Sequence, residues 1–396
     1  MHTPDLHAGL MSGTSLDGVD AVLARWPEPG TETSSATGRP RPVEVAFVHG
    51  PMPVALRAEL MALQADGARE MHRAALAANA LADLYAQTLR RLLEAAGVAP
   101  AAVRSVGAHG QTVRHRPGEF DGTGYTVQLL NGALLAERGG VDVVCDLRSR
   151  DLAAGGQGAP LVPAFHAEVF GRADAATAVL NLGGIANLTL LPPAGQGPVR
   201  GFDCGPANVL MDLWAERHGR GRHDADGAWA AGGRVHAALL QRLLGEPFLQ
   251  RRPPKSTGRD LFHAAWLDGH LDALPAPPAA QDVMATLAEF TAEAACAALA
   301  REAPATTRLL VCGGGAFNGH LMRRLAALAG RPHAPGAHGG PGVTVQRTDA
   351  EGIAPDHVEA LAFAWLARAF DRRVAGNLPA VTGAAGPRVL GALYPA

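Results

Sequence analysis

The chain has 396 residues, with 35 basic and 37 acidic side chains. This near-neutral balance argues against nucleic acid or an anionic membrane as a partner, because proteins that bind either normally carry an excess of basic residues. No apolar run reaches the ~18 residues that a membrane helix needs, and the N-terminus lacks the pattern of a signal peptide, so we expect a soluble protein without a membrane partner. The four cysteines, at positions 145, 204, 296 and 312, never form a C-x-x-C pair, which suits the reduced cytoplasm and offers no structural zinc site; no metal ligand is assigned from the sequence.

The first half of the chain predicts alternating strands and helices. It opens with a β-hairpin, because an apolar run that ends at residues 10–11 meets a turn of Gly, Ser and Thr and resumes over 19–23. A loop rich in Pro, Gly, Ser and Thr follows over 27–42, and apolar residues spaced along one face predict a long helix over 69–96. Further strands are predicted over 101–108 and 141–145.

The second half restarts the same pattern. A strand over 178–182 turns at the glycine pair 183–184 and returns directly, which gives a second glycine-tipped hairpin. A strand over 309–311 then runs into the glycine-rich segment 313–318 and a helix, and a closing helix over 355–370 could pack back on the first half. Two such hairpins, each opening a run of alternating strands and helices, favour an α/β duplication and therefore two domains.

Two glycine-rich turns are candidate phosphate-binding loops. Residues 13–20 combine glycines, hydroxyls and carboxylates, so that backbone N–H groups could approach an anion and a carboxylate could hold a cation or its waters. The segment lacks the lysine of a P-loop, and an ordinary polar turn is the simpler alternative. The run 313–315 lies between a strand and a helix, where a nucleotide commonly binds, but Asn318 breaks the G-x-G-x-x-G fingerprint.

Two carboxylates are candidate catalytic groups. Asp203 lies in a tight Gly/Pro turn before a helix, where it could take a proton from a hydroxyl or water, or simply form an Asx turn or helix N-cap. Glu359 stands in an otherwise apolar helix, where an unpaired carboxylate is costly and thus a functional candidate, or else exposed. His109 and Gln111 suit hydrogen bonds to a sugar. Lys255, the only lysine, either falls there by chance or supplies a compact ammonium group.

These motifs occur in one order, which resembles the 1,6-anhydro-N-acetylmuramic acid kinase family of the actin-like ATPase superfamily over about residues 9–370. The segments that carry the resemblance are 9–20, 107–112, 153–161, 181–187, 202–203, 226–230, 253–260, 313–315 and 359–363. The resemblance implies an α/β fold of two actin-like (ribonuclease H-like) domains, residues 1–152 with 356–396 and residues 153–355, with ATP in the cleft between them.

The resemblance also implies which residues form the site. The two hairpins would hold the phosphates of ATP and the triple glycine would border the adenosine. The ATP-binding residues would be Gly13, Thr14, Ser15, Leu16, Asp17, Gly18, Val19, Asp20, Gly183, Gly184, Asn187, Gly313, Gly314, Gly315 and Asn318. The substrate-binding residues would be His109, Gln111, Arg148, Arg150, Gly205, Asn208 and Lys255. Mg²⁺ would neutralise the phosphates, as phosphoryl transfer generally requires.

The chemistry of the family couples hydrolysis of the 1,6-anhydro ring of this cell-wall sugar to its phosphorylation. Asp203 aligns with the general base of the family and would take a proton from the water that attacks the anomeric carbon, while O6 receives the γ-phosphoryl group of ATP. Glu359 would assist by orienting substrate or water. The product would be N-acetylmuramic acid 6-phosphate, which implies a cytoplasmic role in peptidoglycan recycling and amino sugar catabolism, and the family suggests a homodimer.

The chain departs from the usual Asp-Thr-Gly-Pro-Gly-Asn of the family at two positions. Cys204 replaces Thr and removes a hydroxyl donor beside the base, and Ala207 replaces Gly in a turn that would favour φ above zero. Two alternatives remain open: another actin-like sugar kinase, in which Asp203 would deprotonate an ordinary hydroxyl, and an ATP-gated sensor, which would not need a catalytic base. A glycosidase would also use two carboxylates but has no use for three nucleotide-type loops.

Overall fold

The computed structural model describes residues 5–13, 15–27, 41–258, 261–329 and 342–396. They form two compact units, residues 1–169 with 357–396 and residues 170–356. Thr14 and most of the predicted loop over 27–42 lie outside the described residues. The domain boundaries at 152/153 and 355/356 stay a prediction.

Six strands form the sheet of the first unit, in the order β13-β7-β4-β1-β2-β3. Their bounds are β1 (Leu6–Met11), β2 (Gly18–Arg25), β3 (Val43–Pro51), β4 (Ser105–Ala108), β7 (Val143–Cys145) and β13 (Ala392–Tyr394). The first three strands are antiparallel neighbours, whereas β4 runs parallel to β1 and β7 parallel to β4. The predicted first hairpin is therefore confirmed, with Leu10 opposite Ala21.

Helices and a separate hairpin complete this unit. They are α1 (Val54–Ala62), α2 (Glu70–Ala96), the 3-10 turn η1 (Pro100–Ala102), β5 (Gln111–Pro117), β6 (Gly124–Leu129), α3 (Gly132–Gly139), α4 (Ser149–Ala153), α5 (Val162–Phe170), α13 (Val358–Asp371) and α14 (Pro379–Thr382). The long helix predicted over 69–96 is confirmed as α2. The strand predicted over 101–108 begins only at Ser105, because Pro100 has no N–H for a sheet ladder and the N–H of Ala102 closes a turn on the carbonyl of Ala99.

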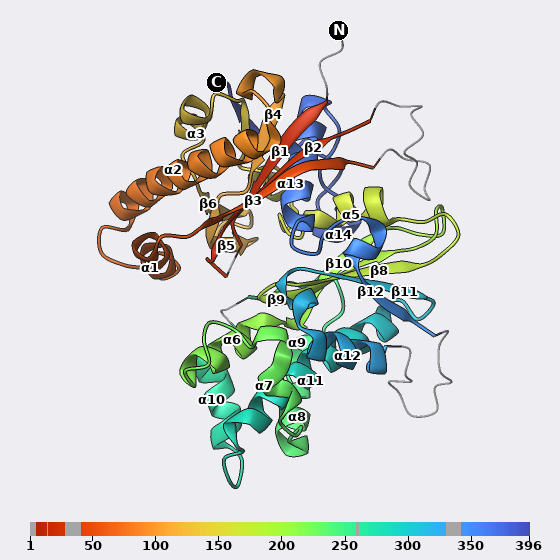
Figure 1. The fold of residues 1–396 in the computed structure, drawn as a ribbon. Helices are drawn as coiled ribbons and strands as arrows, with labels where there is room; N and C mark the ends of the chain where they lie inside the picture. The colour runs from red at the N-terminus through yellow and green to blue at the C-terminus, as the bar shows by residue number, and fades with distance from the viewer. Residues whose placement is uncertain (1–4, 14, 28–40, 259–260, 330–341) are drawn as a thin grey trace. The chain divides into compact units, whose positions relative to one another are not determined.

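The two faces of this sheet contact different helices (Figure 1). Ala8 and Leu10 of β1 point into the core that α2 covers, while the intervening Gly9 faces α13. A Cβ on Gly9 would lie 1.9 Å from the carbonyl oxygen of Ala360, so only glycine permits this close approach of strand and helix. The closing helix thus packs on the first half of the chain, as predicted.

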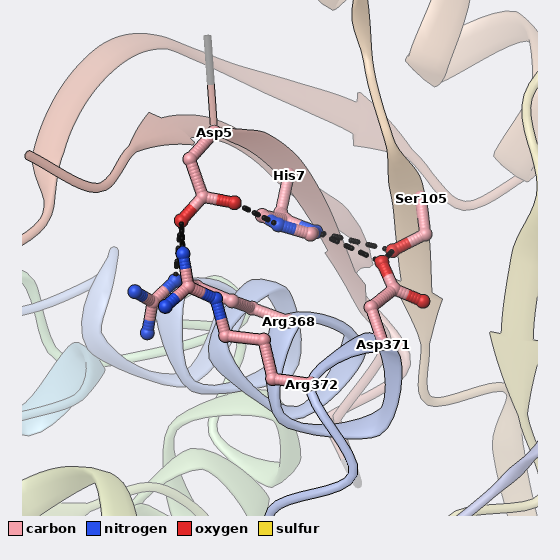
Figure 2. Close-up of polar contacts among 6 residues, drawn as sticks. All are labelled: Asp5, His7, Ser105, Arg368, Asp371 and Arg372. Atoms are coloured by element: carbon pink, nitrogen blue, oxygen red, sulfur yellow. Dashed lines mark hydrogen bonds and ion pairs between the residues drawn. The ribbon is translucent and has the colours of Figure 1, made fainter. Parts of the chain in front are cut away.

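An ionic network fixes the start of β1 to the end of α13 (Figure 2). His7 is buried, and its Nε2 and Nδ1 lie 3.0 Å from Asp5 Oδ1 and 3.1 Å from Ser105 Oγ. The Ser105 hydroxyl donates to Asp371 Oδ2 at 2.7 Å, and Arg368 Nε donates to Asp5 Oδ2 at 2.8 Å. The start of β1 and the end of α13 are therefore joined by one set of charge-assisted hydrogen bonds.

The sheet of the second unit repeats the topology of the first. Its five strands are β8 (Thr177–Leu182), β9 (Ile185–Leu191), β10 (Arg200–Pro206), β11 (Arg308–Cys312) and β12 (Thr344–Arg347). Their order is β10-β9-β8-β11-β12, with three antiparallel strands followed by two parallel ones, as for β3-β2-β1-β4-β7. The duplication, and with it the predicted α/β class of two actin-like units, is confirmed.

One long apolar helix organises the remaining elements of the second unit. The helices are α6 (Asn208–Arg217), α7 (Ala228–Ala231), α8 (Ala237–Leu244), α9 (Pro247–Gln250), α10 (Ala264–Asp272), α11 (Ala280–Glu302) and α12 (Gly319–Leu328), with 3-10 turns η2 (Ala225–Gly227), η3 (Gly314–Phe317) and η4 (Thr348–Glu351). Helix α11 contacts β9, β10 and four of these helices. Among the described helices, it alone has the length and hydropathy of a membrane span, and 83% of that stretch is buried inside the unit, as in a core helix.

Candidate active site

The tip of the first hairpin is held from within by a buried leucine. Leu16 has φ 54° and a fully buried side chain, and its N–H donates to the carbonyl of Gly13 at 3.3 Å. The hydroxyl of Ser15 donates to Asp17 Oδ1 at 2.8 Å. Burying Leu16 turns the polar groups of the neighbouring residues outward, which is the arrangement expected of an anion-binding turn.

The segment that follows β4 supports this tip. Gln111 Nε2 donates to the carbonyl of Gly13 at 3.2 Å, and the Ser12 hydroxyl donates to Gln111 Oε1. His109 Nδ1 donates to the carbonyl of Ser12 at 3.1 Å, while its Nε2 accepts from Arg148 Nη2 at 2.9 Å. Burial, and after it the charge of Arg148, lower the pKa of His109 to about 3, against main-chain hydrogen bonds at Ser12 and Gly110 that raise it. His109 is therefore a neutral imidazole fixed in one tautomer.

Arg148 links this cluster to Glu359. Its Nη1 donates to the carbonyl of Gly158 at 2.8 Å. Burial lowers the pKa of Arg148 to about 10, and the negative charges of Glu359 and Asp151 oppose that shift. Glu359 is half-buried in the first turn of α13. The structure thus brings Arg148 and Glu359 together, whereas Arg150 is exposed on α4.

The tip of the second hairpin is tied to the start of α6. The carbonyl of Gly183 accepts from the N–H of Asn208 at 3.0 Å, and the carbonyl of Gly184 accepts from Ala207 at 3.0 Å. Asn208 Nδ2 donates to the carbonyl of Leu182 at 2.9 Å. Ala207 has φ −110°, so the expectation of a positive φ there is wrong. These bonds satisfy N–H groups that α6 leaves unpaired and set the orientation of the hairpin tip.

The two departures from the family pattern leave Asp203 undisturbed. Cys204 is buried, and its thiol donates to the carbonyl of Ala186 at 3.4 Å, the direction in which a threonine hydroxyl would also donate. Burial raises the pKa of Cys204 above its ordinary value, so the thiol stays protonated. Gly205 adopts φ +147°, a conformation that glycine favours, at the point where the β9–β10 register shifts.

Polar side chains form a row across the strands of the second sheet. Asn181, Asn187 and Asp203 are direct cross-strand neighbours on β8, β9 and β10, so they share one face. The side-chain oxygen of Asn181 is buried without a hydrogen-bond partner among the described residues. Gly313, with φ +79°, packs against that oxygen. Asn318 Oδ1 accepts from the N–H of Leu321 at 2.9 Å and caps α12.

Asp203 has the environment of a proton acceptor. Its carboxylate is half-buried, and its Oδ2 accepts from the N–H of Thr257 at 2.9 Å. Burial raises the pKa of Asp203 to about 7, although the Thr257 N–H and the charge of Lys255 both lower it. A carboxylate that titrates near neutral pH is well matched to general base catalysis. The ammonium group of Lys255 donates to the carbonyls of Phe248 and Leu249, each at 3.1 Å.

Three glycines of the expected ATP site face open space. A Cβ on Gly13, Gly183 or Gly314 would meet no atom of the protein closer than 3.8 Å. By contrast, a Cβ on Gly18 would lie 2.4 Å from the carbonyl of Gly50, and one on Gly315 would lie 2.6 Å from Leu182 Cβ. Packing inside the protein therefore requires glycine at 18 and 315, but not at 13, 183 or 314. Backbone that is bare without a packing reason allows a ligand to approach closely.

Several supporting residues were not identified from the sequence alone. Ser12 and Thr257 lie inside the segments that carry the family resemblance, but only the structure shows their bonds to Gln111 and Asp203. Tyr85, whose hydroxyl donates to the carbonyl of Gly110 at 3.2 Å, lies in the middle of α2 and has no local motif. Among the described residues, no group of three or more His, Cys, Asp or Glu side chains could hold a metal ion.

Comparisons with known proteins agree along the whole chain. The family model for anhydro-N-acetylmuramic acid kinase matches residues 5–396. Relatives that carry this name include one from Variovorax paradoxus, 55% identical over 99% of both chains, and one from Bordetella petrii, 57% identical over 99% of this chain and 96% of the relative. A solved structure, the activator of the 2-hydroxyisocaproyl-CoA dehydratase from Clostridium difficile with bound ADPNP, is 12% identical with a TM-score of 0.43, and the match covers 93% of this chain and 96% of that chain.

Proposed function

The chain belongs to the anhydro-N-acetylmuramic acid kinase family of phosphotransferases, and on that premise we propose that it opens 1,6-anhydro-N-acetylmuramic acid with water while it phosphorylates the sugar from ATP. Water oxygen attacks the anomeric carbon, the bond from that carbon to O6 breaks, and O6 takes the γ-phosphoryl group, so that ADP leaves. The products are ADP and N-acetylmuramic acid 6-phosphate. Such a reaction returns a peptidoglycan fragment to amino sugar metabolism.

The environment of Asp203 carries this proposal. Water is a poor nucleophile until a base takes its proton, and a base works best when its pKa lies near the working pH. Burial raises the pKa of Asp203 to about 7. Its Oδ2 is oriented by the Thr257 N–H, and the residue is half-buried. We assign the proton of the attacking water to this carboxylate.

The open glycines support ATP as the phosphoryl donor. Gly13, Gly183 and Gly314 have no packing reason to be glycine, and each lies in a turn that follows a strand. Together with the other turn residues named above, they would hold the phosphates and border the adenosine. Mg²⁺ usually keeps several waters and is held by one or two carboxylates together with substrate phosphates. Asp17 and Asp20 are the carboxylates of the first hairpin, so they are the groups that would hold such an ion, which would neutralise phosphate charge.

The remaining site residues divide into contacts and supports. We assign Arg150 and Glu359 to contacts with substrate or attacking water, because both residues are partly exposed. Gln111, Asn208, His109 and Arg148 use their polar atoms inside the protein, so we assign them to the support of the site. Gly205 allows the bulge beside the base.

The test asks whether the oxygen of water enters the product. The protein is incubated with ATP and 1,6-anhydro-N-acetylmuramic acid in ¹⁸O-labelled water, and the product is analysed by mass. One ¹⁸O at the anomeric position of a 6-phosphorylated sugar supports the proposal. Phosphorylation without label would instead identify a kinase that acts on an ordinary hydroxyl. Asp203→Asn should abolish turnover but leave ATP binding intact.

Assembly and location complete the proposal. We propose a homodimer in the cytoplasm, which follows from the family resemblance rather than from a contact in the structure. Light scattering on the purified protein reports the mass in solution directly, against 40.8 kDa for one chain.

A further inference from the structure

Lys255 is the only lysine of the chain, and its charge is used inside the second unit. Its Nζ donates to two carbonyls of α9, at Phe248 and Leu249, and lies 4.6 Å from the centroid of the Phe248 ring. The last carbonyls of a helix have no partner within the helix, and a cation is favoured beside them. The ammonium group therefore fixes the segment 253–258 to the end of α9.

The main chain of the same segment reaches Asp203 at two points. The carbonyl of Lys255 accepts from the N–H of Asp203 at 3.2 Å. The N–H of Thr257 donates to Asp203 Oδ2 at 2.9 Å. Because β10 is the edge strand of its sheet, the segment supplies at Asp203 the hydrogen bonds that a neighbouring strand would otherwise supply.

Charged side chains at the end of α11 bind both α9 and β10. Arg301 Nη2 also donates to the carbonyl of Leu249, at 3.3 Å, and its Nε donates to Glu302 at 3.0 Å. Arg200, the first residue of β10, donates to the same Glu302 at 3.3 Å. The strand that carries Asp203 and the helix α9, to which Lys255 is bound, are thus both tied to the end of α11.

We propose that Lys255 is a positioning residue for Asp203: its ammonium group anchors the segment 253–258, and this segment fixes the main chain and the carboxylate of Asp203. The inference rests on the proposed role of Asp203 as the base. It deepens that role, because it names Lys255 as the residue that orients the base and identifies the main-chain contacts through which Lys255 acts. A lysine that instead bound phosphate would need its N–H donors free, and two of the three are already used.

The charge of Lys255 also acts on Asp203 directly. The groups that face Lys255 are Arg301 and Glu302 from α11 and Asp203 and Cys204 from β10. Burial and Arg301 lower the pKa of Lys255, and the other three groups oppose this. When the ammonium group is removed, Asp203 loses a nearby positive charge and a firmly placed Thr257 N–H. Both losses disfavour the carboxylate, so Asp203 should then titrate at a higher pH.

The first test compares Lys255→Met with Lys255→Arg across pH. In Lys255→Met the acid limb of kcat/KM should move up by about one pH unit and kcat at pH 7 should fall about tenfold or more, with KM values for ATP and sugar within about threefold. Lys255→Arg keeps the charge and can donate to both carbonyls, so the acid limb should return to its original position. A rise in KM for ATP with an unmoved acid limb would overturn the proposal and make Lys255 a phosphate ligand.

The second test needs no catalysis, because a single lysine gives a single signal. Protein labelled with ε-¹⁵N-lysine is titrated by NMR, with and without the Asp203→Asn change. The Lys255 ammonium resonance should shift near pH 7 in the unmodified protein and lose that shift in Asp203→Asn. No shift in either protein would overturn the coupling, even if Lys255→Met fails to fold. If the coupling is present but Asp203→Asn retains full turnover, the proposed function fails instead.

Discussion

Asp203 lies directly opposite Asn187 in the antiparallel pair β10–β9, and Asn187 is the third residue after Gly184, which ends the second glycine turn. The register shifts immediately after this pair, between Asp203 and Gly205. The proposed base and the proposed phosphate-binding hairpin therefore belong to one hydrogen-bonded sheet. Their spacing is set by strand pairing rather than by a flexible loop, which suits a reaction whose catalysis depends mainly on positioning.

The activity should fall in acid because the base must be deprotonated. Since the pKa of Asp203 is raised to about 7, kcat/KM should be constant above that pH and decrease about tenfold per pH unit below it. Initial rates of ADP release from pH 5 to 9, with the sugar well below its KM, measure this profile. A profile that stays flat down to pH 5 would contradict the assignment of the proton to Asp203.

Stability should respond to the same carboxylate with the opposite sign. The pKa of Asp203 is raised from 3.8 to about 7 on folding, so the folded protein binds an extra proton between these values. The contribution of Asp203 to the free energy of unfolding is therefore most favourable below about pH 4, and it decreases as the pH rises to 7. Asp203→Asn removes the buried charge, so its Tm at pH 8 should exceed that of the parent, and the difference should vanish near pH 4. The variant should thus be inactive and more stable.

The bare glycine at the second hairpin offers a test of ATP binding. In Gly183→Ala the new Cβ meets no protein atom closer than 3.8 Å, so the fold should tolerate it. If phosphate approaches this backbone, the methyl group should raise the Kd for ATP about tenfold, a loss of about 1.4 kcal/mol. Calorimetric titration with a non-hydrolysable ATP analogue measures the change.

Gly269→Ala is the matched control. Gly269 lies inside α10 with nothing near its added Cβ, so alanine there should leave ATP binding unchanged and stabilise the helix by about 0.5–1 kcal/mol. Equal ATP affinity in Gly183→Ala and Gly269→Ala would exclude the second hairpin from the nucleotide site.

The elements that sequence predicts well are those with local signals. Both hairpins have glycine tips between alternating or apolar strands, and α2 has its apolar residues on one face. The hairpin β5–β6 was not predicted, because its strands are mostly polar and only Gln111 and Leu129 at one end are buried. Without a buried face there is no period-two pattern to detect.

The supports of the site depend on contacts that no local pattern encodes. The carbonyls that hold Lys255 belong to residues six and seven positions earlier, in a helix that the sequence did not predict. His7 meets Asp371 across 364 residues of the chain. Motif order indicates which residues carry the chemistry, but hydrogen bonds between main-chain and side-chain groups appear only when the topology is known.

His109 should support the site through its hydrogen bonds alone. Glutamine can donate to the Ser12 carbonyl and accept from Arg148, so His109→Gln should keep kcat/KM within about tenfold, whereas His109→Phe leaves both partners unsatisfied at about 1–3 kcal/mol each. Denaturant unfolding measures the loss of stability, and kcat/KM for the sugar measures the effect on activity. Because burial holds the pKa of His109 at about 3, the acid limb near pH 7 should not move in His109→Gln. A displaced limb would show that His109, not Asp203, supplies the titrating group.

The network at the start of β1 should make the protein sensitive to acid through Asp5. Burial alone would raise the pKa of Asp5, but hydrogen bonds from His7 and Arg368 and their charges outweigh it, so the pKa lies well below its ordinary value. Asp5 then contributes stability that is present above pH 4 and lost as pH falls toward its lowered pKa. Asp5→Asn should cost about 1.5–3 kcal/mol in urea unfolding at pH 7, typical of hydrogen bonds to charged groups, and the deficit should shrink below pH 4.

Asp66→Asn is the control: its carboxylate is fully exposed beside Arg114, so its loss should cost at most about 1 kcal/mol. Equal costs for the two variants would mean that the network in Figure 2 contributes no more than a surface ion pair.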